Sequence, residues 1–109
     1  MKRGDVVTVA APGDFGKPRP AVVVQTDAFP SDHDSVVVCQ MTSVLEDASD
    51  FRVTVEATPE NGLRVTSQIM ADKPVTVRRR RIGTRIGSLS RRHVGQLNSA
   101  LAFVIGLSD

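Results

Sequence analysis

The chain of 109 residues can bury a single core but is too short for two domains, so we expect one domain over residues 1–109. A content of 40% hydrophobic and 24% charged residues is typical of globular proteins and argues against global disorder. We find no signal segment at the start and no stretch near the ~20 apolar residues of a membrane helix, so we expect a cytoplasmic protein that makes no membrane contact.

Basic residues are concentrated late in the sequence. Residues 73–108 contain eight Lys and Arg and no Asp or Glu, so this segment carries +8 and the remainder must carry −6 to give the net charge of +2. Arginine offers permanent, bidentate contacts to phosphate, which suits a polyanionic partner. A solvated basic face is the equally weighted alternative.

Short β-branched and apolar runs, separated by turn-forming residues, predict a series of strands. We expect these strands at residues 5–10, 21–25, 35–42, 51–56, 67–71, 75–79 and 82–87. The run 21–25 is almost unbroken in its apolar character, which favours a strand covered on both faces or one at the centre of a barrel. Residues 51–56 alternate apolar and polar side chains, as in a half-exposed strand. With no helix between the early strands, an antiparallel sheet is expected.

The end of the chain changes to a helical period. From the candidate N-cap Ser90, apolar residues recur at helical spacing, at Val94, Leu97, Leu101, Val104 and Ile105. The pattern predicts one C-terminal amphipathic helix packed on a strongly bent sheet. The fold class is therefore mainly β.

Familiar catalytic signatures are absent from the sequence: it has no Cys/His pair, no glycine-rich phosphate loop and no cluster at metal-ligand spacing. We therefore expect neither a metal nor a cofactor. His33 and His93 are interpreted as surface residues, and Cys39, within an apolar strand, as a buried structural thiol. A nuclease built from this chain would depend on arginine, hydroxyls, backbone amides and a carboxylate.

Four segments resemble, in order and spacing, conserved patterns of the MazF/PemK toxin family. They are Arg3-Gly4-Asp5-Val6-Val7, the Gly16-Lys17-Pro18-Arg19-Pro20 step before an apolar strand, the strand ending in Thr42-Ser43, and Ser67-Gln68-Ile69-Met70-Ala71-Asp72. With the terminal helix, the similarity spans essentially the whole chain.

The resemblance implies an SH3-like barrel of bent antiparallel strands, shared with the CcdB toxins, and a homodimer with two-fold symmetry. It also implies the toxin of a type II toxin–antitoxin system: a sequence-selective endoribonuclease, or mRNA interferase, that cleaves single-stranded RNA through the RNA's own 2′-hydroxyl and needs no metal. The expected protein partner is an acidic, MazE-like antitoxin.

On this resemblance, Arg19 and Thr42 are the candidate catalytic residues. Arg19 lies between a Gly/Pro-rich loop and an apolar strand, where its guanidinium could stabilise a phosphorane or donate a proton; a salt bridge to the barrel is the alternative. The Thr42 hydroxyl could bind a nonbridging phosphate oxygen, or it could cap a turn.

The candidate RNA-binding residues are Lys17, Ser43, Asp72, Arg79 and Arg81. Asp72 could contact RNA, orient the catalytic arginine or form an ion pair with a nearby arginine. If the run Arg78–Arg81 is a strand, its guanidiniums alternate between two faces, lining a groove or only adding solubility.

The general base is not determined by the resemblance. The loop before the Arg-Pro pair offers Asp14 as the candidate, without the histidine of some relatives, and Met70 stands where some relatives have arginine.

The main competing function is that of a CcdB-like, non-enzymatic DNA gyrase poison. The Arg19-Pro20 step argues against it, as does the tail at residues 105–109, which lacks the Trp-Gly-Ile ending of CcdB. A catalytically inactive binding domain is the third class.

Overall fold

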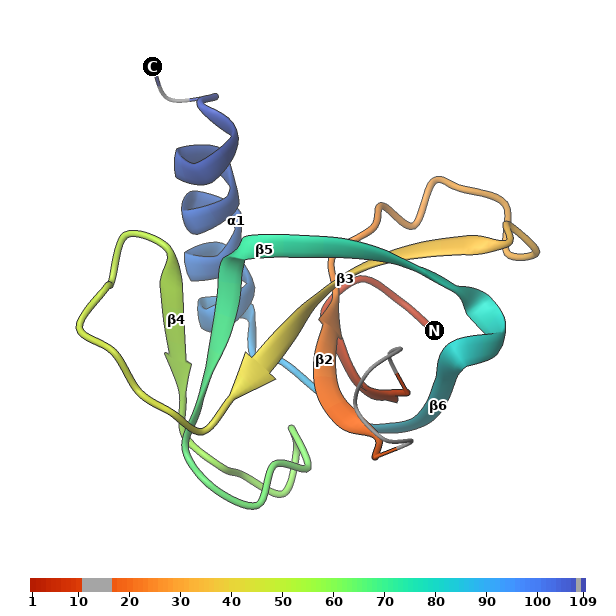
Figure 1. Cartoon of the computed structure of the whole chain (residues 1–109), viewed down its shortest axis with the longest axis horizontal. Coiled ribbons are helices and arrows are strands. Elements are labelled where there is room, and N and C mark those ends of the chain that lie inside the picture. The colour runs from red at the N-terminus through yellow and green to blue at the C-terminus, as the bar shows by residue number, and fades with distance from the viewer. Residues whose placement is uncertain (11–16, 108) are drawn as a thin grey trace.

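The computed structural model describes residues 1–10, 17–107 and 109. In this part the chain forms a strand-rich body and a terminal helix (Figure 1). The elements are β1 (Asp5–Val9), β2 (Arg19–Val23), β3 (Ser35–Thr42), β4 (Arg52–Val55), β5 (Ser67–Arg78), the 3-10 turn η1 (Arg79–Arg81), β6 (Ile82–Ser88) and α1 (Arg91–Ile105). The expected mainly β class with a C-terminal helix is confirmed.

The strands form one antiparallel sheet in the order β4-β5-β3-β2-β1-β6. The sheet bends strongly, and β5 turns sharply along its length (Figure 1). The loop 56–66, between β4 and β5, lies against the edge strand β6, where the Ser88 amide donates to the Glu60 carbonyl at 2.9 Å. This loop therefore covers a sheet edge that would otherwise expose unpaired backbone groups.

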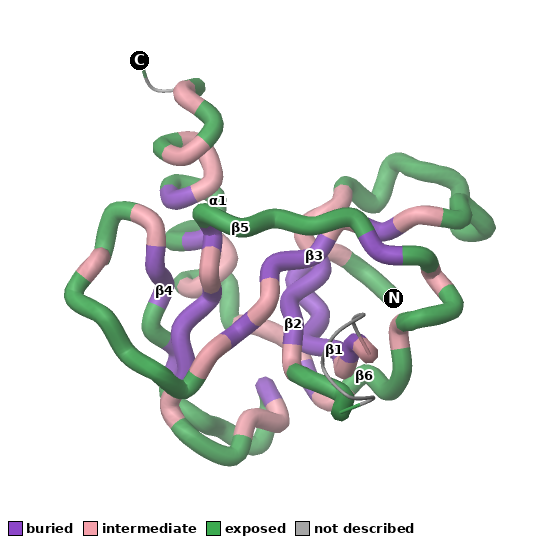
Figure 2. Tube along the Cα trace, in the orientation of Figure 1, coloured by how far each residue is buried: buried purple, intermediate pink, exposed green. Residues whose placement is uncertain are grey.

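The apolar runs are buried on both sides of the sheet, as expected for 21–25. Val22 and Cys39 lie in a cluster that also contains Leu97 of α1, whereas Ala21 and Val23 lie in a second cluster, with Val7. Figure 2 shows these buried segments running through β1, β2 and β3. Because the central strands are packed from both faces, they give a rigid base to the residues at their ends.

The terminal helix follows its sequence signals closely. The Ser90 hydroxyl accepts a hydrogen bond from the His93 amide at 3.2 Å, which caps the first turn. The helix ends at Gly106, whose φ of 83° is a left-handed conformation that glycine adopts easily.

Residues 67–78 form one strand, so the prediction of two strands was wrong. The predicted break between the two halves nevertheless corresponds to a real irregularity. The register with β3 changes there, between the pairs Met41–Ile69 and Cys39–Pro74. The extra residues of β5 at this irregularity produce its bend, in the way a bulge does.

The run Arg78–Arg81 is not a strand, so the condition for an alternation of faces along it is not met. Only Arg78 belongs to β5, and the next three arginines form η1. The Arg79 amide donates to the Asp34 carbonyl at 2.7 Å, which ties the turn to the loop before β3. The chain must reverse here to bring β6 beside β1, so these guanidiniums cannot be sorted into strand faces.

Candidate active site

A cleft of about 720 Å³ opens where β2 begins and β3 ends. The sequence-predicted residues Arg19, Thr42 and Ser43 all line it. Residues 63–65 of the loop 56–66 line the same cleft. The cleft-lining residues in the described part of the chain include two arginines and no carboxylate, so the cleft favours an anion.

Arg19 is held by its backbone at the first position of β2. It pairs with Val9 of β1, which is buried, and it is flanked by Pro18 and Pro20. Proline fixes its own φ and also disfavours helical conformations in the preceding residue, so this segment has little freedom. The Arg19 side chain is exposed and lines the cleft, as expected of a group that meets a ligand.

Thr42 ends β3, directly opposite Gln68 of β5. Its Oγ1 accepts a hydrogen bond from the Val44 amide at 3.1 Å, so the turn-capping role considered from the sequence is present. This bond uses the oxygen as an acceptor only. The hydroxyl hydrogen remains available to donate to a ligand in the cleft, so the two roles are compatible.

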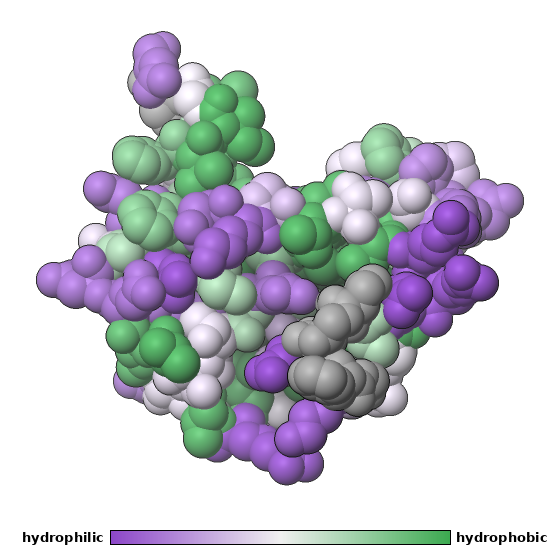
Figure 3. All heavy atoms as spheres, in the orientation of Figure 1, coloured by the Kyte–Doolittle hydropathy of each residue, from purple (hydrophilic) through white to green (hydrophobic). Residues whose placement is uncertain are grey.

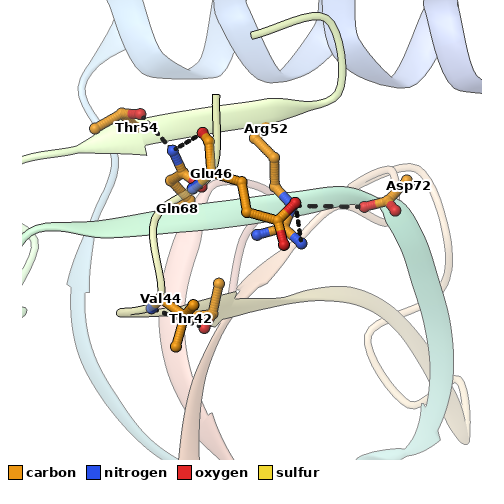
Figure 4. A network of polar contacts seen from close by, with 7 residues as sticks. All are labelled: Thr42, Val44, Glu46, Arg52, Thr54, Gln68 and Asp72. Atoms are coloured by element: carbon orange, nitrogen blue, oxygen red, sulfur yellow. Dashed lines mark hydrogen bonds and ion pairs between the residues drawn. The ribbon is translucent and has the colours of Figure 1, made fainter. Parts of the chain in front are cut away.

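A polar network holds the loop that follows this turn (Figure 4). Gln68 is buried, and its side-chain amide accepts from the Glu46 amide at 3.0 Å and donates to the Glu46 carbonyl at 2.9 Å. The same Nε2 group donates to Thr54 Oγ1 on β4 at 3.1 Å. The glutamine side chain thus pairs with both backbone groups of Glu46 and fixes the chain two residues beyond Val44.

Arg52 is a buried charge that the sequence pattern did not reveal. The alternation of residues along β4 predicts that Arg52 faces solvent, yet its side chain is only 7% exposed. Its Nη2 lies 3.7 Å from Glu46 Oε2, and its Nε lies 3.9 Å from Asp72 Oδ1. Its Nε has no hydrogen-bond partner among the described residues. The loop after β3 and the bend of β5 cover this face, and neither feature leaves a signal in the local pattern.

Asp72 therefore forms an ion pair, one of the three roles predicted for it, with Arg52 as its partner. Lys17 is exposed, two residues before Arg19. Asp14, the candidate base, lies outside the described residues. Met70, which stands where some relatives carry arginine, lines the cleft.

Arg79 and Arg81 lie apart from the cleft. The Arg79 Nε donates to the His33 carbonyl at 2.7 Å, and Arg79 lines a separate cavity of about 440 Å³. The Arg81 Nη1 donates to the Ala10 carbonyl at 3.4 Å. Hydrophilic side chains gather over this edge of the molecule (Figure 3).

The remaining titratable candidates are not cleft residues. His33 is exposed and packs on Phe29, with ring centroids 4.8 Å apart. Burial and the neighbouring Arg92 lower the pKa of His93 below its ordinary value of 6.5. Cys39 is fully buried, as expected, and burial together with the Asp72 carboxylate raises its pKa to about 11.

No three His, Cys, Asp or Glu side chains in residues 1–10, 17–107 and 109 are grouped so that they could hold a metal ion. Over the same residues, α1 is too short and too polar to cross a membrane.

Residues 2–105 match a family model described as a PemK-like, MazF-like toxin of type II toxin–antitoxin systems. A relative from Mycolicibacterium smegmatis, named a probable endoribonuclease MazF, is 38% identical over 109 residues, covering 99% of each chain.

Solved structures establish a shared fold. A mycobacterial endoribonuclease in complex with its cognate antitoxin has a TM-score of 0.81 at 23% identity, covering 98% of this chain and 96% of that one. Toxin MazF-mt6 of Mycobacterium tuberculosis has a TM-score of 0.81 at 20% identity, covering 94% and 96%. A MazE–MazF complex from Deinococcus radiodurans gives 0.77 at 19% identity, covering 98% and 97%.

Proposed function

This chain belongs to the PemK-like, MazF-like toxins of type II toxin–antitoxin systems, and we propose that it is an endoribonuclease that cleaves single-stranded RNA in the cytoplasm without a metal ion. The observation that carries the proposal is the meeting of Arg19, Thr42 and Ser43 in one cleft without a lining carboxylate among the described residues. A phosphodiester fits that combination of charge and donors.

The reaction needs no external nucleophile. The 2′-hydroxyl loses its proton and attacks the adjacent phosphorus, the bond from phosphorus to the 5′-oxygen breaks, and that oxygen takes up a proton. The products are a 2′,3′-cyclic phosphate and a 5′-hydroxyl. Negative charge builds up on the nonbridging oxygens during this step, so preorganised donors around them accelerate it.

The predicted site residues have distinct roles in this scheme. The Arg19 guanidinium supplies two parallel donors and a permanent charge to the phosphorane. The Thr42 hydroxyl donates to a nonbridging oxygen, and the hydrogen bond that it accepts from the Val44 amide fixes its position. Ser43 adds a hydroxyl and an amide as hydrogen-bond donors. Lys17 adds a positive charge that attracts the RNA. Asp14 is the proposed base.

The proposed partners follow from the charge distribution. The +8 of residues 73–108, to which Arg79 and Arg81 contribute, can attract an RNA backbone or an acidic antitoxin tail. Relatives that share the fold are known as toxin–antitoxin complexes. We propose a homodimer whose RNA groove is closed by a MazE-like antitoxin. Asp72 is proposed to act through its pairing with Arg52, not through RNA.

Purified protein incubated with a long RNA in EDTA tests the proposal. We expect cleavage that leaves a 2′,3′-cyclic phosphate or 3′-phosphate, and no cleavage of DNA. Arg19→Ala and Thr42→Ala should each lower cleavage by roughly 10²-fold, because they remove transition-state contacts. Arg19 is exposed, so its removal should change thermal stability little, whereas Thr42→Ala also loses the bond from the Val44 amide and should be slightly less stable. Lys2→Ala, which removes an exposed charge outside both the cleft and residues 73–108, is the control.

Products with a 3′-hydroxyl, or cleavage abolished by EDTA, would contradict the mechanism. The relatives named above give no support to a CcdB-like gyrase poison. Gyrase-dependent DNA breaks without RNA cleavage would restore that alternative.

A further inference from the structure

Arg64 is a second arginine of the cleft, and it belongs to none of the sequence motifs described above. It is exposed, and no hydrogen bond or ion pair joins its side chain to another described residue. Arg52, Arg78 and Arg85, by contrast, each lie beside a carboxylate. An unpaired guanidinium in an anion-favouring cleft is free to bind a ligand.

The backbone that carries Arg64 is rigid although it belongs to a loop. The buried Asn61 side chain accepts from the amides of Thr58 and Leu63, both at 3.0 Å, and donates to the Glu56 carbonyl at 2.8 Å. These bonds determine the path of the chain immediately before Arg64, so its side chain starts from a fixed point.

Gly62 locks the same loop onto β6. Its φ is 70°, and a Cβ at this position would lie 2.0 Å from the Ile86 carbonyl oxygen. Only glycine permits so close an approach of the two backbones. The contact brings Leu63 and Ile86 together as neighbours in the cleft wall.

The cleft surface around Arg64 is apolar. Leu63, Val65, Met70 and Ile86 line it, and Val65 is 56% exposed. A phosphate makes no favourable contact with an apolar surface. The face of an unstacked base, in contrast, can pack against apolar side chains while its edge receives hydrogen bonds. An arginine beside that surface can supply two donors to one base edge.

This surface is close to the Thr42 turn. Thr42 pairs with Gln68, and Arg64 precedes Gln68 by four residues, which span at most roughly 14 Å when extended. The Ser67 hydroxyl donates to the Val65 carbonyl at 3.0 Å and keeps the intervening chain folded back. A base packed here would belong to a nucleotide close to the scissile phosphate.

We propose that Arg64, with Leu63, Val65, Met70 and Ile86, forms a subsite for one unstacked nucleobase of the RNA and reads the acceptor atoms on its edge. The inference rests on the proposed function, since it assigns sequence preference to that same cleft. Guanine, which presents two acceptors on one edge, matches the arginine fork best.

The test compares cleavage rates on RNAs that differ by one base at each position flanking the mapped cleavage site. The wild-type protein should prefer one base, with guanine as the expected one, at one of these positions. Arg64→Ala should reduce that preference by roughly tenfold or more while preferences at other positions stay unchanged. Arg64→Lys should restore part of the affinity but not the preference, because a point charge cannot replace the planar fork. Lys2→Ala, which removes one exposed positive charge away from the cleft, is the control.

Three results would overturn the subsite: an unchanged preference in Arg64→Ala, full rescue by Arg64→Lys, or an equal loss on every RNA with a weaker salt dependence, which would indicate a phosphate contact. Binding of the same RNAs, each with a 2′-deoxy nucleotide at the cleavage position, is measured in parallel. If the wild type cleaves no RNA, the proposed function fails, and the binding series still decides whether Arg64 discriminates between bases.

Discussion

Replacing Gln68 by leucine removes the side chain that holds the loop after the Thr42 turn, while keeping nearly the same volume. Three hydrogen bonds are lost: two to the Glu46 backbone, at 3.0 and 2.9 Å, and one to Thr54 at 3.1 Å. Thr42 itself, its pairing in the sheet and Arg19 are untouched. The variant therefore isolates the positioning of the turn from its chemistry.

A net value of about 1 kcal/mol for each hydrogen bond gives an upper limit of about 3 kcal/mol for the loss in unfolding free energy. Glu46 and Thr54 are exposed, so water can replace part of the hydrogen bonding that they lose. We therefore expect the unfolding free energy to fall by about 2 kcal/mol. If this energy mainly keeps the loop docked, the docking equilibrium falls roughly 30-fold. We expect kcat to fall by roughly tenfold and KM to change little.

Urea denaturation and steady-state RNA cleavage, at a temperature where both proteins are fully folded, measure the two effects. Thr54→Val removes only the 3.1 Å bond to Gln68, so it should lower stability slightly and leave kcat close to wild type. Gln68→Leu with the expected stability loss but wild-type kcat would refute the link between this network and the Thr42 turn.

Two further predictions concern the thiol and the assembly. The folded protein keeps Cys39 protonated up to a pKa of about 11, against 9.0 for an unperturbed thiol, so its contribution to stability should be constant below pH 9 and fall as the pH rises to 11. Cys39→Ala, followed by denaturation across this range, should lack that decline; an identical profile would contradict it. The protein should sediment as a dimer at micromolar concentration, and an acidic antitoxin peptide should compete with RNA less effectively as salt rises. A monomer, or an antitoxin complex with unchanged RNA affinity, would exclude this assembly.

The local pattern of the sequence determined the elements of the fold. The strand at Ser35–Thr42 and the cap at Ser90 agree with their predicted positions because both depend on neighbours in the chain: a β-branched run bounded by turns, and a hydroxyl beside free amides. The burial of residues 21–23 on both faces likewise followed from their unbroken apolar character. The order of four short segments was enough to indicate the family.

Only the tertiary structure decided which side chains share the cleft. Arg64 lies far from Arg19 and Thr42 in the sequence, and it meets them because Asn61 fixes the path of its loop and Gly62 packs that loop closely against β6. The burial of Arg52 had the same kind of cause, since a loop and a bent strand cover a face that alternation assigns to solvent. Periodicity reports the neighbours along a strand, whereas these contacts depend on long-range pairing and backbone approach, which no local pattern encodes.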